Sequence, residues 1–284
     1  MNTRNEKDQL KYDPATHFGF GDNWQTFSQL ITEAKIDQAV ADMKRILGTE
    51  DLARQSFVDV GCGSGLHSLV ALRLSATSVT GFDMDLESVE TARQVLSKYA
   101  PDRDWQVEKR NVFETFDDDQ RKYDVVYSWG VLHHTGAMWQ GIEKTMALVA
   151  DGGRFAIAIY RKTPCCNGWR RFKRVYAGLP AGLQIFLRWP YIFLFCLALL
   201  ATGRNPFAYI CNYENNRGMN YFTDVHDWLG GFPYESASPD ELKMFFETRG
   251  YETVSEFTKP TRLWGVFGTG CNEFLFRRVG SSPS

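Results

Sequence analysis

The feature that most constrains this chain is a short apolar strand that runs directly into a glycine-rich turn. Residues 57–65 read Phe-Val-Asp-Val-Gly-Cys-Gly-Ser-Gly, and a helical pattern starts at Leu66. Glycine suits such a turn because the backbone takes positive φ angles and because a ligand can approach main chain that carries no Cβ. A strand, a glycine turn and a helix in this order predict a ligand site at the carboxyl edge of a parallel sheet.

Residues 55–160 alternate β-branched runs with helical patterns, which is typical of βαβ units in a parallel sheet covered by helices. Asp85 is the expected N-cap of one helix, and Ser238 followed by Pro239 is expected to start another that ends near Thr248. The other predicted helices and strands are helices at 66–74 and 86–99 and strands at 56–60, 78–82, 105–109, 123–127, 154–159, 251–258 and 271–278.

The glycines of this turn are spaced GxGxG, and Leu66 stands where a nicotinamide-binding loop needs a small residue. This spacing suits a cofactor without phosphates. Asp83 ends the next strand, where its carboxylate can accept both hydroxyls of a ribose. Each feature alone also fits a structural role, because glycine turns serve packing and a terminal aspartate often caps a helix. Together they favour a cofactor that carries a ribose.

Three stretches carry a resemblance to a known superfamily. VDVGCGSG resembles motif I of the class I S-adenosylmethionine-dependent methyltransferases, VTGFDMD resembles motif II, and YDVVYSWGVLHHT with LVADGGRFAIAIY resembles the motif IV and V region of methyltransferase-11-type members. The resemblance implies an α/β fold with a Rossmann-like, seven-stranded, mostly parallel sheet whose last strand is antiparallel. It also implies S-adenosyl-L-methionine as cofactor and S-adenosyl-L-homocysteine as product.

The same resemblance implies a set of cofactor-binding residues. Gly61 and Gly63 would line the methionine portion, Asp83 would bind the ribose, and Asn111 and Val112 would flank the adenine. The family usually has aspartate where Asn111 stands, although an amide oxygen can accept the same hydrogen bond. Ser128 and Trp129 would form the wall beneath the sulfonium. The full predicted set is Asp59, Gly61, Cys62, Gly63, Gly65, Asp83, Met84, Asn111, Val112, Ser128 and Trp129.

Two histidines are the candidates for acid–base chemistry. Methylation of a hydroxyl requires its proton to leave, and His133 and His134 follow the fourth strand at the edge where ligands bind. We favour a mixed arrangement in which one of the two caps the next helix and only the other reaches the pocket. We prefer His134 as the base because similar family members keep a histidine at the matching place. Asp227 is expected to orient the imidazole or the acceptor.

Residues 217–235 are dense in aromatic, charged and turn residues, a composition typical of a binding loop. Polar groups that alternate with aromatic rings suit a polyhydroxylated or ring-bearing acceptor. The alternative is an irregular surface loop whose polar residues only satisfy turns. The predicted substrate-binding residues are Arg217, Tyr221, Asp224, Trp228 and Tyr234.

Residues 161–213 hold eight Lys or Arg and no Asp or Glu, a local charge of +8 in a chain of net charge -2. This segment also contains an apolar run at 189–201, which is shorter than the about 20 residues that span a bilayer. We favour a lid helix buried against the core. The alternative is a basic, aromatic-rich lid that makes peripheral contact with an anionic membrane or admits a lipid-linked substrate.

The chain is expected to divide into four segments: an N-terminal helical segment flanking the cofactor site (1–54), the S-adenosylmethionine-binding core (55–160), a lid insertion after the fifth strand that is rich in helices (161–238), and a C-terminal helix with the closing strands (239–284). In the first segment, Trp24 or Phe18 can close the pocket or pack on the outside of the sheet. The six cysteines lack the spacings of a zinc site, so we expect no metal. A charged N-terminus without an apolar core favours a cytoplasmic protein.

The predicted function is O-methylation of a small-molecule or saccharide acceptor, with a lipid-linked form as an option. The alternatives are N- or C-methylation of a quinone-type or amine metabolite, and a cofactor-binding protein that has lost turnover. A nucleic-acid substrate is disfavoured by the net charge of -2 and by the absence of an Asn-Pro-Pro-Tyr motif after Tyr127.

Overall fold

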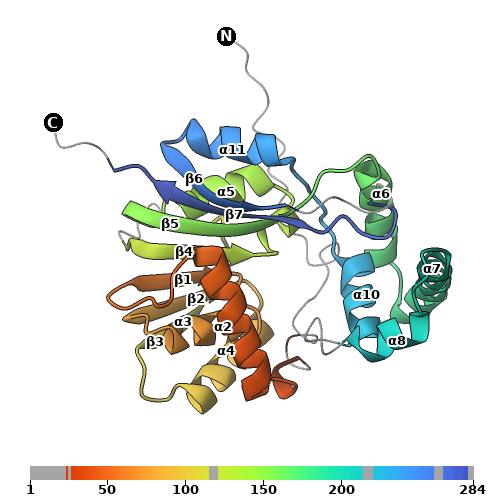
Figure 1. Cartoon of the computed structure of the whole chain (residues 1–284), viewed down its shortest axis with the longest axis horizontal. Helices are drawn as coiled ribbons and strands as arrows, with labels where there is room; N and C mark the ends of the chain where they lie inside the picture. The colour runs from red at the N-terminus through yellow and green to blue at the C-terminus, as the bar shows by residue number, and fades with distance from the viewer. Residues whose placement is uncertain (1–23, 25–26, 115–120, 214–219, 259–264, 281–284) are drawn as a thin grey trace, which may run out of the picture.

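The computed structural model describes residue 24 and residues 27–114, 121–213, 220–258 and 265–280. Its centre is one seven-stranded sheet in the order β3-β2-β1-β4-β5-β7-β6 (Figure 1). The first five strands pair in parallel, and β7 pairs antiparallel with both β5 and β6. The strands are β1 (Ser56–Val60), β2 (Ser78–Asp83), β3 (Trp105–Lys109), β4 (Tyr123–Trp129), β5 (Val149–Tyr160), β6 (Tyr251–Phe257) and β7 (Cys271–Arg278).

Helices cover both faces of the sheet because successive side chains of a strand point to opposite faces. Phe57 of β1 packs with the helices of one face, and Val58, its neighbour, packs with those of the other. The first face carries α2 (Glu33–Leu47), α3 (Leu66–Arg73) and α4 (Leu86–Tyr99), and the second carries α5 (Met138–Met146) and α11 (Pro239–Glu247). The predicted Rossmann-like, mostly parallel sheet is confirmed.

The helix starts follow the predicted caps. The Asp85 side chain accepts the Glu87 backbone N–H at 2.9 Å, which fixes the first turn of α4. Ser238 and Glu241 form a reciprocal capping box at the start of α11, and Pro239 occupies the first turn, where its missing N–H costs nothing. Two strands extend past their predicted ends: β4 continues to Trp129, and β5 begins at Val149.

The described residues 161–213 and 220–238 form a group of helices after β5, which Figure 1 shows on one side of the sheet and which we call the lid. Its helices are α6 (Cys166–Ala177), α7 (Ala181–Ala201), α8 (Pro206–Cys211) and α10 (Tyr221–Gly230). The lid has its own apolar cluster, separate from the two clusters of the sheet and built around Tyr176, Ile192, Tyr221, Val225 and Leu229. The lid is therefore a second packing unit that contacts the core without merging with it.

Two expectations about the lid were wrong. The stretch that we predicted as a binding loop contains a regular helix, α10, which Asn220 caps by accepting the Phe222 N–H at 2.9 Å. Tyr221, Val225 and Leu229 recur every four residues and form its buried face, a period that the mixed composition obscured. The apolar run 189–201 belongs to a longer helix, α7, of 21 residues, and most of its side chains are exposed instead of buried against the core.

Candidate cofactor and acceptor site

The glycine turn after β1 has the predicted backbone. Gly61, Gly63 and Gly65 have φ angles of 78°, 51° and 77°, which only glycine adopts without strain. The backbone N–H groups of Gly61 and Cys62 both donate to the Phe82 carbonyl, at 2.7 and 2.9 Å. The turn is thereby held against the end of β2.

The residues that lie close to Gly61 and Gly63 leave no room for a side chain at either position. A Cβ on Gly61 would lie 2.5 Å from both methyl carbons of Val131, and one on Gly63 would lie 2.8 Å from the indole of Trp24. Trp24 therefore lies over the glycine turn. Of the two placements that we predicted for the N-terminal segment, this agrees with the one over the cofactor site. Phe18 lies outside the described residues. Val131 was not predicted, and only its position just after β4 could have suggested it.

Asp83 connects the turn to the end of β2. Its carboxylate accepts the Gly63 N–H at 2.9 Å and the Asp85 N–H at 3.0 Å. Burial raises its pKa to about 6, although the backbone hydrogen bonds from Asp85 and Gly63 oppose that shift. A carboxylate held in this way beside bare glycine main chain fits the ribose hydroxyls of an adenosyl cofactor.

Three other predicted cofactor residues support the turn from behind. Asp59 is buried, accepts the Ser68 hydroxyl at 2.8 Å, and has its pKa raised to about 7 by burial. The Cys62 thiol is buried against Gly81, whose Cβ would lie 3.2 Å from the sulfur. A Cβ on Gly65 would lie 2.9 Å from the backbone of Ala92. Contact of these residues with the cofactor remains a prediction, and the described contacts give them packing roles.

The residues predicted around the adenine and the sulfonium differ in what their side chains contact. The Asn111 side-chain oxygen accepts the Phe113 N–H at 3.0 Å and has a second lone pair for another donor. The Ser128 hydroxyl is buried and donates to the Val60 carbonyl at 3.2 Å, so only its backbone can face a ligand. Trp129 stacks on Tyr127 with ring centroids 5.3 Å apart. Val112 is half-buried and Met84 is exposed.

The histidine pair lies on a short 3-10 turn, η1 (Leu132–His134), after β4. His134 Nδ1 lies 2.8 Å from the Pro233 carbonyl oxygen. A carbonyl can only accept, so Nδ1 carries the proton and Nε2 carries the lone pair. A Cβ on Gly231 would lie 2.7 Å from His134 Cε1, so this glycine leaves room for the imidazole. His134 is therefore held in the tautomer that a general base needs.

His133 has a different environment. Its side chain is 1% exposed, its Nδ1 lies 3.3 Å from the Tyr160 backbone nitrogen, and its Nε2 is buried without a hydrogen-bond partner. Burial lowers its pKa well below the usual value, and the nearby charges of His134 and Lys173 act in the same direction. His133 is thus a neutral, packed residue beside the candidate base.

A segment that we call the strap, residues 231–237, ties the lid to the core at this point. The Glu235 N–H donates to the His133 carbonyl at 2.9 Å, and the Glu235 carboxylate accepts the Met138 N–H at 2.9 Å at the start of α5. Ala237 pairs with Arg161 just after β5. The strap therefore positions η1 from the lid side.

A buried lysine that the sequence did not single out lies between the lid and the core. Lys173 of α6 is fully buried, with Nζ 3.8 Å from the centre of the Trp228 ring and hydrogen-bonded to the Trp228 carbonyl. Burial lowers its pKa, whereas the charge of Asp227 raises it. Burial also raises the pKa of Asp227 to about 7, with Lys173 and Arg188 opposing the shift. Orientation of His134 by Asp227 stays a prediction.

The predicted substrate residues have different surroundings. Trp228 packs on Tyr160 at the end of β5, with centroids 5.3 Å apart, and its indole N–H is buried without a partner. Tyr221 and Tyr234 are buried in the packing of the lid, so contact with an acceptor would require the lid to open. Asp224 accepts the Tyr213 hydroxyl. Arg217 lies outside the described residues.

The described residues contain no group of three His, Cys, Asp or Glu side chains that could hold a metal ion. The six cysteines carry free thiols, and Cys62 and Cys166 are the buried ones. The groups gathered at the edge of the sheet are the main chain of the glycine turn, the carboxylate of Asp83 and the imidazoles of His133 and His134. These groups suit an organic cofactor and proton transfer.

Comparison with known proteins agrees with this geometry. Residues 58–155 match the family model of a methyltransferase domain. The chain is 29% identical over 133 residues to the ubiquinone biosynthesis O-methyltransferase of Brucella ovis, a match that covers 47% of this chain and 48% of that protein. The chain thus spans about half the length of the curated relatives it matches.

Two solved structures have a similar fold. Magnesium protoporphyrin IX methyltransferase from Synechocystis with bound SAH superposes with a TM-score of 0.51 and 15% identity, over 92% of this chain and 87% of that one. An O-methyltransferase family protein from Burkholderia thailandensis gives a TM-score of 0.53 and 14% identity, over 93% and 59% of the two chains. At such identities the likeness concerns the fold.

The strand order, the glycine turn and the carboxylate at the end of β2 define a Rossmann-like methyltransferase domain. With the family model that matches residues 58–155, they show that this chain contains a methyltransferase domain of the class I, S-adenosylmethionine-dependent kind.

Proposed function

We propose that the protein transfers the methyl group of S-adenosylmethionine to a hydroxyl oxygen of a small-molecule acceptor. The observation that carries this proposal is the hydrogen bond from His134 Nδ1 to the Pro233 carbonyl, which assigns the proton of a half-buried imidazole to Nδ1 and the lone pair to Nε2. This histidine follows β4 at the carboxyl edge of the sheet, where ligands of open α/β folds bind.

The residues at the turn fit the cofactor. Gly61 and Gly63 offer main chain without side chains, and Asp83 offers a carboxylate for the ribose hydroxyls. Trp24 lies over Gly63 and can shield that part of the turn from water. When bound, the cofactor supplies an electrophilic methyl group on a sulfonium. The chain itself has to align the acceptor with that methyl group and exclude water.

His134 would act on the acceptor and not on the cofactor. His134 Nε2 would take the hydroxyl proton as the acceptor oxygen takes the methyl group, and the electron pair of the carbon–sulfur bond would leave with S-adenosylhomocysteine. The products would be a methyl ether and, on the chain, an imidazolium. The Pro233 carbonyl stabilises the proton on Nδ1 throughout. His133 stays neutral because burial lowers its pKa, so it adds no positive charge that would oppose protonation of its neighbour.

A saccharide or lipid-linked acceptor is the finer form of this proposal. Aromatic rings connect the lid to the end of β5: Trp169 packs on Trp228 at 5.2 Å, and Trp228 packs on Tyr160 at 5.3 Å. Tyr160 in turn lies 5.2 Å from His134. Such rings suit the flat faces of a sugar or of an aromatic acceptor.

The competing proposals are N- or C-methylation and a binder without turnover. An amine or a phenolate is already nucleophilic, so alignment alone could supply the rate and His134 would be dispensable. A binder would keep the glycine turn and Asp83 without needing a base.

The atom that receives the methyl group separates these proposals. The protein would be incubated with S-adenosylmethionine and three acceptor sets that present hydroxyls, amines or enol carbons, and mass spectrometry would locate the transferred methyl. We expect turnover with the hydroxyl set. Turnover with amines or carbon acceptors alone would contradict O-methylation, and cofactor binding without turnover in any set would favour the binder.

A further inference from the structure

The outer face of α7 carries an unbroken apolar row. Phe186, Trp189, Phe193, Leu197 and Leu200 follow one another at intervals of three or four residues, which places them on one side of the helix. All five are exposed, and Phe186 reaches 73% of its full exposure and Phe193 63%. We call these five side chains the outer row. A row of large apolar side chains on a protein surface marks an interaction site.

The opposite face of α7 already has its partners. Ile192 and Leu199 are buried in the lid, and Arg188 lies 3.3 Å from His226 of α10. Among the described residues, α7 is the one helix long and apolar enough to cross a membrane by length and composition. Because one face is fixed on α10, the helix would lie along a membrane surface instead of crossing it.

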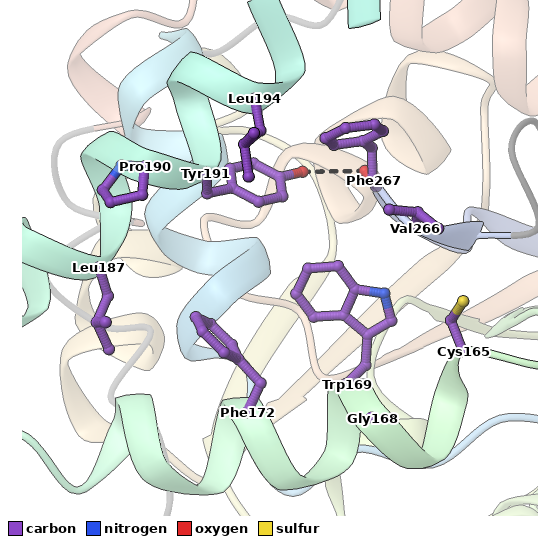
Figure 2. Close-up of a pocket in the computed structure, with 10 residues that line it drawn as sticks. All are labelled: Cys165, Gly168, Trp169, Phe172, Leu187, Pro190, Tyr191, Leu194, Val266 and Phe267. Atoms are coloured by element: carbon purple, nitrogen blue, oxygen red, sulfur yellow. Dashed lines mark hydrogen bonds between the residues drawn. The ribbon is translucent and has the colours of Figure 1, made fainter.

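An apolar groove opens beside the outer row. It lies between α6 and α7, has a volume of about 680 Å³, and is lined mainly by apolar side chains. Figure 2 shows Trp169 and Phe172 from α6 directed toward Tyr191 and Leu194 from α7. Leu194 is exposed and lines the groove, and it lies one helical turn before Leu197 of the outer row, so the groove adjoins the outer row.

The charged residues of the two helices that form this surface, α6 and α7, are all basic. Arg171 stands on the same strip of α6 as Gly168, which lines the groove, and Arg204 follows the end of α7. Both arginines are exposed, and the sequence 161–213 holds no carboxylate. Two copies of this face would bring like charges together, whereas an anionic surface would be complementary to it.

We propose that the outer row and the adjoining groove dock the protein on an anionic lipid bilayer, with α7 lying in the interface. The apolar side chains enter the boundary of the acyl chains, and the arginines at the rim contact the lipid phosphates. Docking would bring the groove, and the Trp169–Trp228 contact behind it, next to the lipid.

Vesicle co-sedimentation of the full chain tests this proposal without cofactor or acceptor, so its outcome does not depend on the proposed reaction. The vesicles would contain either phosphatidylcholine alone or phosphatidylcholine with phosphatidylglycerol. We expect binding to the anionic vesicles only, and weaker binding at high salt, where the screening length falls from about 10 Å to about 3 Å.

Matched variants locate the surface. Phe186→Ser with Phe193→Ser should lower vesicle affinity at least about tenfold, because two aromatic side chains no longer leave water. Arg171→Gln with Arg204→Gln should lower it about fivefold per residue at low salt. Met244→Ser with Val254→Ser, at sites that are 61% and 51% exposed outside the lid, is the control and should leave binding unchanged.

Three results would overturn the proposal. One is wild-type protein that stays in solution with anionic vesicles, and another is full vesicle binding by the Phe186 and Phe193 variant. The third comes from light scattering: a wild-type dimer that this variant converts to a monomer, without vesicle binding, would assign the outer row to a second copy of the chain. Circular dichroism of each variant would verify that the lid helices are intact.

Discussion

The core and the lid use apolar side chains in opposite ways. In the core, Phe57, Val58 and Phe155 are completely buried between the sheet and its helices. In the lid, α7 leaves Phe186 and Phe193 largely exposed although its composition is more apolar than that of any core helix. The core packs to hold a cofactor whose shape is common to a superfamily. The lid instead leaves apolar side chains at the surface, where they can contact another molecule.

This difference between the core and the lid predicts two kinds of variant. Changes at the glycine turn should alter cofactor affinity, and changes where the strap meets η1 should alter turnover. The largest effect is expected for His134→Ala, which should lower kcat about 10² to 10⁴-fold with little change in cofactor affinity, the range usual for loss of a general base. Steady-state rates at saturating cofactor would measure it.

His133→Ala is the matched comparison because the two histidines are adjacent but only His133 is buried. His133→Ala should lower the melting temperature because it opens a cavity between η1 and Tyr160, and it should change kcat less than His134→Ala does. Near-wild-type kcat in His133→Ala, His134→Ala and Asp227→Asn together would rule out a general base and bring N- or C-methylation forward.

The second effect tests the cofactor side alone. Asp83→Ala should weaken S-adenosylhomocysteine binding at least about tenfold, because a hydrogen bond to a charged group contributes roughly 1.5 to 3 kcal/mol. Calorimetry would measure the affinity, and Asp85→Ala is the control, since Asp85 caps α4 beside the site. Unchanged affinity, or binding of NAD in place of the adenosyl cofactor, would contradict the assignment of the turn.

The third effect is expected where the strap contacts the candidate base. A Cβ at Gly231 would lie 2.7 Å from His134, so Gly231→Ala should displace the imidazole and lower kcat about tenfold at unchanged cofactor affinity. Gly182→Ala serves as control because nothing lies within 4 Å of a Cβ there. Equal rates for the two variants would mean that His134 needs no fixed position.

The smallest effect concerns pH and the buried carboxylates of the core. The pKa of Asp59 is raised to about 7 from 3.8, so between these values the native protein holds a proton that the unfolded chain has lost. The free energy of unfolding of the cofactor-free protein should therefore fall as the pH rises from about 4 to about 7.

Asp59→Asn should flatten that slope and raise the melting temperature above pH 7 by roughly a few degrees. Thermal unfolding across this range would measure it, with Asp102→Asn at an exposed turn as control. A slope that is identical in wild type and Asp59→Asn would show that Asp59 is ionised in the native protein throughout.

The sequence predicted the core well because its signals are local. The bounds of α4 follow from Asp85 and the apolar spacing that starts at Leu86, and the glycine turn follows from backbone angles that few residues accept. The lid was harder because its helices pack mainly on one another. No short stretch of sequence predicts the exposure of α7 or the position of Lys173 beside Trp228. Both depend on which faces of α6 and α7 pack against α10.

The site shows the same limit. Asp83 and the glycines could be placed from spacing alone, whereas Val131 lies beside Gly61 because β4 is the sheet neighbour of β1, and strand order is not contained in any local pattern. Trp24 reaches Gly63 from a segment that precedes the sheet, and sequence patterns say nothing about where such a segment lies.

The strap makes the tautomer of the candidate base depend on the position of the lid. The nitrogen of His134 that holds the proton is selected by a carbonyl of Pro233, which belongs to the lid and not to the core. If the lid moves away to admit an acceptor, that carbonyl leaves with it and the imidazole loses the partner that fixes its tautomer. The imidazole would then hold the tautomer of a general base only while the lid is closed. Proton removal would therefore require an enclosed acceptor, and an open site would not transfer the methyl group.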